Sequence, residues 1–258
     1  MHGPIYVRRY LLNLARLGVT TGLAVGLFGT AALLLAGRFF AAYGDLLFLA
    51  AVLLPVLVCL LGFEKKPLRA VGLTARRCDP GDFFFGMLWA AIGFLGILWV
   101  AFLLTERNDV WIGLFQSASV PRLAHYLIVG FCEELLFRGY LFQNLFCEWP
   151  FWRRSLLSAA VYLLPHSLCA GGNDFPALLF VCLFGLLANY LTYCTGSIWM
   201  CIGFHGMWNL LAATCFCGQG TLRIAAPLFL LLSFPLLRGL FHRRGRRAQA
   251  SLSSPLYF

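Results

Sequence analysis

The chain has 258 residues, of which 61% are hydrophobic and only 12% are charged. This composition is typical of a polytopic membrane protein and excludes a long soluble segment that could form a separate water-exposed domain. The net charge of +10 could indicate nucleic-acid binding, but its distribution along the chain favours contact with lipid headgroups. We therefore expect membrane lipids, and no nucleic acid, among the partners.

Eight apolar segments are candidate transmembrane helices, because a spanning helix needs about 20 apolar residues. In chain order they are 17–37, 43–63, 83–104, 123–146, 154–170, 176–194, 197–215 and 224–241. The sequence thus predicts an all-α bundle of about eight transmembrane helices. We expect one membrane domain over 1–258, with a catalytic core at 120–215, flanking helices at 1–119 and 216–241, and a basic, disordered cytoplasmic tail at 242–258.

The first apolar segment resembles a signal peptide only superficially, because its apolar run is long and no clear Ala-x-Ala site follows it. We interpret it as a retained helix. Gly18, Gly22 and Gly26 form a ridge of small residues along it, which predicts close packing against another helix. A homodimer face is the alternative.

Most of the 10 cysteines lie in apolar segments, where cysteine acts as a small hydrophobic residue. Cys169, Cys215 and Cys217 fall near the non-cytoplasmic face, where a disulfide can form. The sequence does not decide whether they pair.

The fourth apolar segment contains Glu133-Glu134-Leu-Leu-Phe-Arg138. Charges at membrane depth are costly, so they are rare and usually functional. On a helix, Glu134 and Arg138 have the i,i+4 spacing that favours an ion pair. Glu133 is turned about 100° away, so we expect it to face a cavity and act as a general base. A purely structural charge cluster is the alternative.

Two later segments add polar groups at similar depth. Tyr162 and His166 lie one turn apart, and Pro165 removes a backbone hydrogen bond beside the histidine. His205 and Asn209 share a face of the seventh segment. Counted along the helices at about 1.5 Å per residue, these groups and the glutamates can meet near the middle of the membrane. His125, at the interfacial start of the fourth segment, needs no special role.

The three motifs resemble the CPBP family, which includes the type II CAAX prenyl endopeptidases and bacteriocin-processing membrane proteins. Its signature is Glu-Glu-xxx-Arg, Phe-xxx-His and His-xxx-Asn, in that order, and the resemblance covers about residues 121–215. Phe184-Gly185 and the Thr195-Gly196-Ser197 turn also look like the family. Tyr162 stands where the family usually has phenylalanine. The tyrosine keeps the aromatic ring and adds a hydroxyl.

The resemblance implies a glutamic-type intramembrane endopeptidase that needs no cofactor. By motif position, Glu133 and His166 would activate a water, and His205 and Asn209 would stabilise the oxyanion. The pair Glu134 and Arg138 would hold the geometry, with Tyr162 as support. The expected substrate is a protein or peptide with a membrane-associated segment, and a bacterial inner membrane is the expected location. The sequence indicates neither the cleavage site nor the oligomeric state.

Three other interpretations stay open at this point. Glu133, His166 and His205 could instead bind zinc as two histidines and one carboxylate with an open position. A proton-coupled transporter could also use buried carboxylates and histidines, although no two-half repeat is evident. A third possibility is a non-catalytic immunity scaffold.

The basic residues predict the topology. If the N-terminus is cytoplasmic, fifteen lysines and arginines fall on cytoplasmic segments and four (Arg38, Arg107, Arg122 and Arg223) on the opposite side. This asymmetry satisfies the positive-inside rule for eight spans with both termini cytoplasmic. Reporter fusions after residues 70, 110 and 245 should therefore report a cytoplasmic, a non-cytoplasmic and a cytoplasmic position, respectively. An external C-terminal reporter would contradict the topology.

Overall fold

The computed structural model describes residues 4–34, 38–105, 119–169, 174–215 and 220–252. Within these ranges the chain forms eight α-helices and no strand. They are α1 (Pro4–Leu34), α2 (Arg38–Leu57), α3 (Asp79–Thr105), α5 (Val120–Glu134), α6 (Phe151–Cys169), α7 (Phe175–Thr195), α8 (Trp199–Cys215) and α9 (Gly220–Leu252). Two π-helices, η1 (Val58–Phe63) and η3 (Leu135–Leu145), continue α2 and α5, and η2 (Leu68–Val71) is a 3-10 turn.

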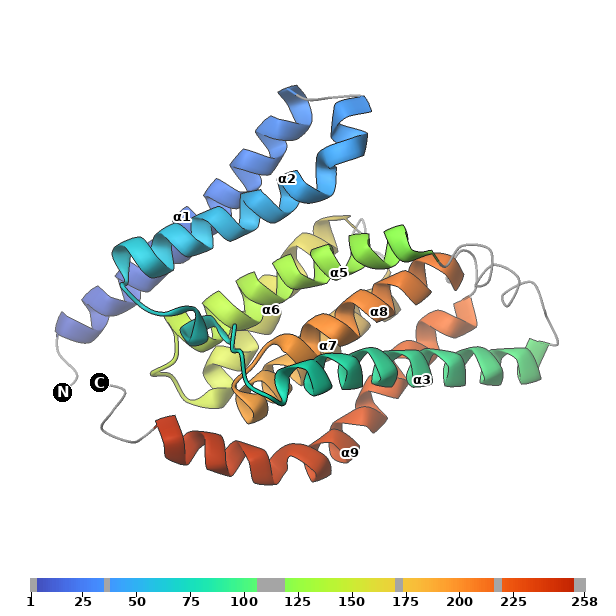
Figure 1. Cartoon of the computed structure of the whole chain (residues 1–258). Helices are drawn as coiled ribbons and strands as arrows, with labels where there is room; N and C mark the ends of the chain where they lie inside the picture. The colour runs from blue at the N-terminus through green and yellow to red at the C-terminus, as the bar shows by residue number, and fades with distance from the viewer. Residues whose placement is uncertain (1–3, 35–37, 106–118, 170–173, 216–219, 253–258) are drawn as a thin grey trace.

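The helices pack around α5 and α8, which lie against one another at the centre (Figure 1). On one side, α1 and α2 form a hairpin that reaches α5 through α2. On the other, α3 covers α8, α6 pairs with α7, and α9 crosses over α7. The contacts between α5 and α6 run mainly through η3, which leaves space between the other halves of these helices.

The fold is that of an all-α polytopic membrane protein, as the composition predicts. Four of the described helical segments are long and apolar enough to cross a membrane: Arg8–Ala31, Tyr43–Phe63, Asp79–Val100 and Phe175–Thr195. The other segments that we expected to span are also helical, but they are shorter or more polar. α8 has 17 residues and the apolar part of α9 is Ala225–Phe241, while α5 and α6 carry the charged and polar motif residues.

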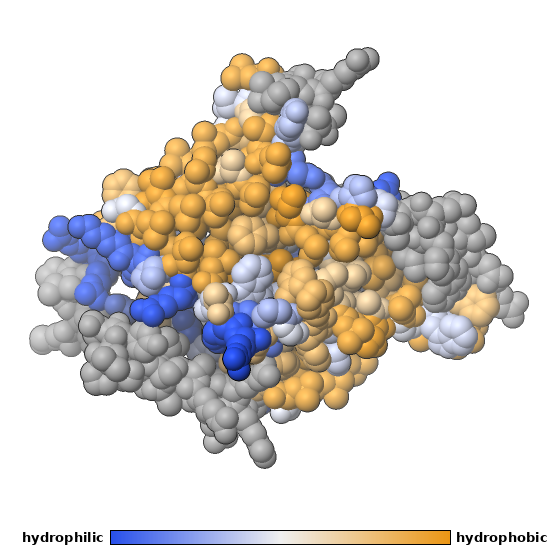
Figure 2. All heavy atoms as spheres, viewed as in Figure 1, coloured by the Kyte–Doolittle hydropathy of each residue, from blue (hydrophilic) through white to orange (hydrophobic). Residues whose placement is uncertain are grey.

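The surface matches this interpretation. Large apolar side chains such as Leu33, Trp99 and Leu232 are exposed, and hydrophobic residues cover most of the face seen in Figure 2. Such a surface suits lipid rather than water, because soluble proteins rarely expose large apolar patches. Hydrophilic residues gather instead toward the end where both termini lie (Figures 1 and 2).

Segments that the charge count assigns to one side of the membrane also lie at one end of the bundle. Arg9 in α1 donates to Glu148, in the turn between η3 and α6, at 2.8 Å. Arg76, which precedes α3, donates to the backbone carbonyl of Thr195 at the end of α7 at 2.7 Å. These contacts bring α1 to the turn before α6, and the segment before α3 to the end of α7.

The fourth expected span is not a continuous α-helix. α5 ends at Glu134 and η3 follows directly, so Arg138 stands in a π-helix. Every residue of η3 except Gln143 is buried, and two of its polar side chains are bonded to Glu64. Glu64 accepts from the Tyr140 hydroxyl and the Asn144 amide, both at 2.9 Å. π-Helical turns are frequent at functional sites, and this one carries the motif arginine.

Two further expectations about the flanking helices are wrong. Gly18, Gly22 and Gly26 are exposed on α1, and a Cβ on any of them would meet no atom within 4 Å; α1 packs on α2 through another face that includes Ala24 and Thr20. The tail after Phe241 continues α9 as helix to Leu252, because the arginines, alanines and glutamine there favour helix. The side chains of Cys169, Cys215 and Cys217 lie outside the described residues.

The close helix packing occurs instead between α3 and α8. A Cβ on Gly86 would overlap the carbonyl oxygen of Met200, and a Cβ on Gly203 would overlap that of Phe83. Glycine at both positions lets the two backbones touch, as small residues commonly do between membrane helices. This contact fixes α8, and so His205, against α3.

Replacement of Gly203 by valine should therefore prevent correct folding, because the added side chain meets backbone that cannot move aside. Gly22→Val on α1 is the matched control and should fold normally, since its Cβ faces open space. Size-exclusion profiles and thermal unfolding of both variants in detergent measure the difference. Equal stability of the two variants would show that the α3–α8 contact is less tight than described.

Candidate active site

A cavity of about 330 Å³ lies between the helices of the core. Glu133 enters it from α5, His166 from α6, and His205 and Asn209 from α8. The four residues to which we assigned catalytic roles therefore line one cavity, although they come from three helices. The remaining lining residues are mostly apolar: Tyr162, Asp174, Ala177, Phe180, Val181, Phe184, Phe204, Trp208, Ala212 and Ala226.

Glu133 is the carboxylate that faces the cavity. Its side chain is 22% exposed, and its Oε2 atom is buried without a hydrogen-bond partner among the described residues. Oε2 lies 3.8 Å from Nε2 of His166 and 3.7 Å from Nε2 of His205. These separations exceed a direct hydrogen bond and suit groups that share a small bridging molecule.

Glu134 faces the opposite way, into the protein, and its side chain is completely buried. Its Oε1 atom accepts from Nη1 of Arg138 at 3.0 Å, which is the ion pair that the spacing predicts. The same oxygen lies 2.8 Å from Nδ1 of His205. One carboxylate oxygen thus joins α5, η3 and α8, because a buried charge is stable only when it is paired.

These contacts determine which nitrogen of each histidine carries a proton. Nδ1 of His205 must donate, because the paired carboxylate of Glu134 only accepts. Nδ1 of His166 lies 2.8 Å from the backbone carbonyl of Tyr162, and a carbonyl also only accepts. Both Nδ1 atoms are therefore held as donors by the protein, and both Nε2 atoms face Glu133.

Glycines allow α5 and α8 to approach closely enough for these contacts. A Cβ on Gly130 would lie 3.2 Å from the backbone nitrogen of Gly206, and one on Gly206 would lie 3.0 Å from Cα of Leu127. Any larger side chain would separate the two helices. His205 directly precedes Gly206, and Glu134 lies one helical turn after Gly130, so the close approach brings these two side chains to hydrogen-bond distance.

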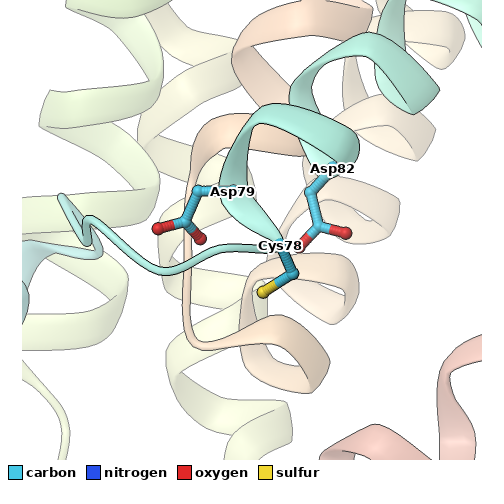
Figure 3. Close-up of side chains that lie close together, drawn as sticks. All are labelled: Cys78, Asp79 and Asp82. Atoms are coloured by element: carbon cyan, nitrogen blue, oxygen red, sulfur yellow. The ribbon is translucent and has the colours of Figure 1, made fainter.

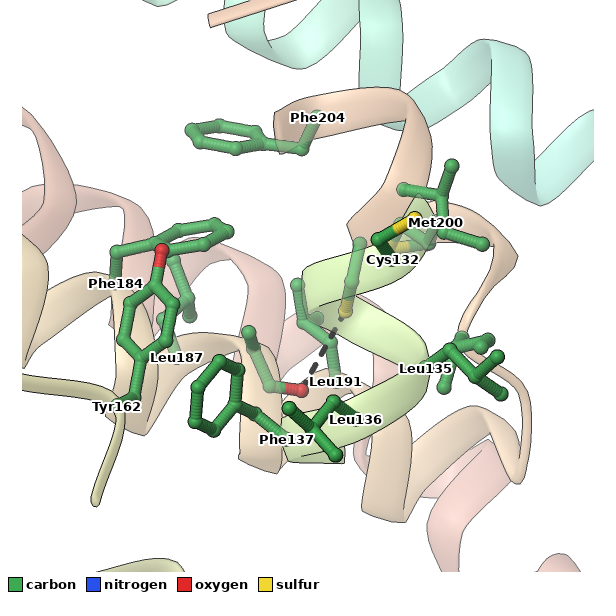
Figure 4. Packing of buried hydrophobic residues seen from close by; sticks show 14 of the residues in the cluster. Cys132, Leu135, Leu136, Phe137, Tyr162, Phe184, Leu187, Leu191, Met200 and Phe204 are labelled. Carbon is green, nitrogen blue, oxygen red and sulfur yellow. Dashed lines mark hydrogen bonds between the residues drawn. The ribbon is translucent and has the colours of Figure 1, made fainter. Parts of the chain in front are cut away.

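Tyr162 forms the wall between the buried charge and the cavity. The guanidinium carbon of Arg138 stacks 4.0 Å from the centre of its ring, which stabilises a buried cation that has few hydrogen-bond acceptors. The ring of His166 lies 4.5 Å from it, and Phe184 lies beside it (Figure 4). These contacts are all made by the aromatic ring of Tyr162. A phenylalanine, the usual residue of the CPBP family at this position, could make the same contacts.

The proposed zinc ligands are not gathered as a metal site. Zinc–nitrogen bonds of about 2.0–2.1 Å require ligand atoms to lie within about 4.2 Å of one another. Among the described residues only Cys78, Asp79 and Asp82 bring three ligand atoms within 4.8 Å of one another (Figure 3). Glu133 lies near both histidines, but the three atoms do not form such a group.

The cluster shown in Figure 3 has a structural explanation. Asp79, at the start of α3, accepts from the Thr74 hydroxyl at 2.8 Å and from Nη2 of Arg76 at 3.0 Å. Its carboxylate therefore holds the turn that leads into α3. This contact places Arg76 against the end of α7.

Sequence reasoning overlooked two features near the site. The aromatic residues Phe180, Phe184, Phe204 and Trp208 line the cavity; their i,i+4 spacing on α7 and α8 was the signal, but it also fits ordinary packing. His125, which we left without a role, lies 2.6 Å from Asp45 and links α5 to α2; neither of these two residues lines the cavity.

Comparison with known families agrees with the geometry. Residues 115–211 match the family described as Type II CAAX prenyl endopeptidase Rce1-like. This segment contains all three motifs, and the match agrees with the resemblance to the CPBP family. Neither the curated proteins nor the solved structures include a significant match to the chain.

The chain is thus an integral membrane protein with an intramembrane protease core of the CAAX type. This class accounts for the location of the cavity, since its polar residues sit on helices whose outer surfaces are apolar. It also indicates that the partners are membrane lipids and a protein or peptide substrate.

Glu134→Gln should lower the stability of the protein as well as its activity. The change leaves Arg138 buried without its ionic partner, and breaking a buried pair costs about 3–5 kcal/mol. The isosteric change Glu133→Gln, one residue away, is the control and should leave the unfolding temperature almost unchanged because Glu133 pairs with no arginine. Thermal unfolding in detergent measures both; a stable Glu134→Gln protein would argue against the role of this pair.

Proposed function

We propose that this protein is a glutamic-type endopeptidase that hydrolyses a peptide bond within the membrane, without a metal. The observation that carries the proposal is the position of Glu133 Oε2, a buried and unpartnered acceptor 3.7–3.8 Å from two histidine Nε2 atoms. A water between Glu133 and His166 can donate one hydrogen to each, and its lone pair is then free for attack. Glu133 acts as the general base.

In the proposed reaction the water oxygen forms a bond to the carbonyl carbon as its proton passes to Glu133. The carbonyl oxygen takes up the negative charge of the tetrahedral intermediate. Glu133 then returns the proton to the leaving nitrogen, the carbon–nitrogen bond breaks, and a carboxylic acid and an amine are released; the second proton of the water then passes from the acid to the amine, which gives a carboxylate and an ammonium group. Atoms and charge balance without any further reactant.

The oxyanion is stabilised from α8 in this proposal. His205 must then carry a proton on Nε2 as well as on Nδ1, because Nδ1–H is already used by Glu134. Asn209, one turn further along α8 and on the same cavity, supplies a second donor from its amide. Preorganised donors of this kind often make the largest electrostatic contribution to catalysis.

We also propose that both termini face the cytoplasm. The basic segments that the charge count assigns to the cytoplasm include Arg9 and Arg76, whose contacts lie at one end of the bundle. Positive charge is retained on the cytoplasmic side during insertion. The substrate would then be a membrane-associated protein or peptide whose scissile bond reaches the cavity within the bilayer.

Glu133→Gln should abolish cleavage while the protein remains folded. Glutamine keeps the shape of the side chain but cannot accept the proton of the water. Cleavage of a membrane-associated peptide by the purified protein in detergent, with unfolding temperature as the folding control, tests this. Retained activity in the folded variant would exclude Glu133 as the base.

Asn209→Ala should lower kcat by about 100- to 1000-fold, the usual loss for one oxyanion donor, with little change in KM. Metal analysis of the same preparations separates this mechanism from a zinc mechanism. If His166 and His205 were zinc ligands, the purified protein would contain stoichiometric zinc, and the His166→Ala or His205→Ala variant would lose it. That result would overturn the glutamic mechanism.

A further inference from the structure

The cavity extends from the catalytic residues toward one end of the bundle only. On α7 its lining begins at Asp174, directly before the helix, and ends at Phe184 near the middle. On α8 it begins at Phe204 and ends at Ala212, near the end of the helix. A short turn joins α7 to α8, which run in opposite directions, so both sets lie in the same half of the bundle (Figure 1). Four rings of these two helices form the aromatic wall of the cavity: Phe180, Phe184, Phe204 and Trp208.

This half lies away from the end of the bundle where basic segments meet. At that end Arg9 contacts Glu148, and Arg76 contacts the carbonyl of Thr195, the last residue of α7. We call it the basic end; α1 begins and α9 ends there (Figure 1). The lining of α7 starts instead at the first turn of the helix, which is at the opposite end.

The protein is closely packed between the site and the basic end. Residues 200–206 of α8 are all buried, as is every residue of η3 except Gln143. Hydrogen bonds join the elements here: Lys66 donates to Asn144 at 2.8 Å, and Gln143 donates to the backbone carbonyl of Thr192 at 3.3 Å. A substrate could reach the site from the basic end only by breaking these contacts.

The opposite half of the same helices is loosely packed. None of residues 120–129 of α5, 163–168 of α6 and 175–183 of α7 is buried. Contacts between α5 and α6 run mainly through η3, so these two helices separate in this half. The side chains of Glu133 and His166 are 22% and 31% exposed. Since the basic end is closed, the site communicates with the surface through this half.

The dimensions of the cavity limit the form of the substrate. The stretch from Asp174 to Phe184 spans about 15 Å at 1.5 Å per residue, which an extended peptide covers with about four or five residues at 3.3–3.6 Å each. An α-helix of that length, about 10–12 Å wide with its side chains, occupies about 1,200 Å³ or more. The cavity of about 330 Å³ therefore admits a short extended segment, whose outermost residues stay in the mouth.

The charge of the lining limits the substrate further. The lining residues that the structure describes include neither lysine nor arginine, whereas Asp174 adds a carboxylate at the mouth. An acidic substrate residue would meet no cation there, and like charges repel. The segment that enters is therefore neutral or basic.

We propose that the cavity opens to the non-cytoplasmic face of the membrane, and that the substrate is an extended, neutral or basic juxtamembrane segment of a protein or peptide present on that face. This proposal rests on the proposed endopeptidase activity and on the proposed cytoplasmic position of both termini. Positive charge is retained on the cytoplasmic side during insertion, so the basic end is cytoplasmic and the cavity mouth is not. The scissile bond lies about four or five extended residues inside the mouth.

Labelling with a membrane-impermeant maleimide tests the orientation without any substrate. Ala177→Cys places a thiol in the cavity near its mouth, and Cys78 and Cys147 are native thiols exposed at the basic end. The full-length protein is expressed in bacterial cells, and mass spectrometry of its peptides locates the label. Ala177→Cys should be labelled in spheroplasts and not in inside-out vesicles, whereas Cys78 and Cys147 should show the reverse.

Ala160→Cys is the matched control, because Ala160 is exposed on α6 but does not line the cavity; a thiol that faces lipid should be labelled from neither face. If Ala177→Cys does not fold, Ala212→Cys tests the same cavity. Labelling of the cavity thiol from the face that labels Cys78 and Cys147, or from neither face, would overturn the inference. Inverted labelling of all three thiols would overturn the topology and the inference together.

Sided cleavage connects the orientation to the activity. The probes are unmodified peptides with an apolar membrane segment, five varied residues and a block of lysines, since charge holds them on the face to which they are added. Wild-type protein should cleave them in spheroplasts and not in inside-out vesicles, glutamate among the varied residues should lower cleavage, and Glu133→Gln should be inactive in both.

The same peptides, incubated with purified protein in detergent, distinguish the two kinds of failure. Cleavage in detergent combined with cleavage only from the cytoplasmic face, or only of prenylated peptides added to that face, would overturn the inference and leave the protease intact. Absence of cleavage in detergent, or cleavage that persists in Glu133→Gln, would overturn the proposed function, while the labelling pattern still shows on which face the cavity opens.

Discussion

The buried carboxylate of Glu134 is the interaction on which the site depends. Its Oε1 atom contacts both Arg138 and His205, so it connects α5, η3 and α8. A carboxylate without these partners could not stay charged at this depth. The same contact orients the imidazole of His205 and commits its Nδ1 atom to donation, which turns Nε2 toward the cavity and Glu133. The carboxylate that forms the structural ion pair with Arg138 therefore also orients His205 in the site.

Two neighbouring glutamates have different surroundings because of helix geometry. Successive residues of a helix are turned by about 100°, so Glu133 faces the cavity while Glu134 faces the protein interior. The transition from α5 to η3 occurs directly after them. η3 is held by Glu64, which accepts from the Tyr140 hydroxyl, and by the Ser158 hydroxyl, which donates to the backbone carbonyl of Phe137. The polar core is thus fixed from several helices, which suits a site that must keep donors and acceptors in place inside a membrane.

The aromatic half of the cavity adds a second level of organisation. The motif residues come from α5, α6 and α8, within the matched segment, whereas the space beside them is bounded also by α9. A protease core can keep its polar groups while the flanking helices change the shape of the substrate cavity.

The sequence by itself determined the membrane class, the helices and the polar residues of the site, because hydropathy and i,i+4 spacing are local properties. It predicted the pair of Glu134 and Arg138 for the same reason. Only the tertiary structure decided which glycines carry helix contacts: Gly18, Gly22 and Gly26 look suitable but face outward, whereas Gly86 and Gly203 touch the opposing backbone. The link from Glu134 to His205, the π-helix after α5 and the aromatic wall likewise depend on how distant helices meet, and that is not encoded in any local pattern.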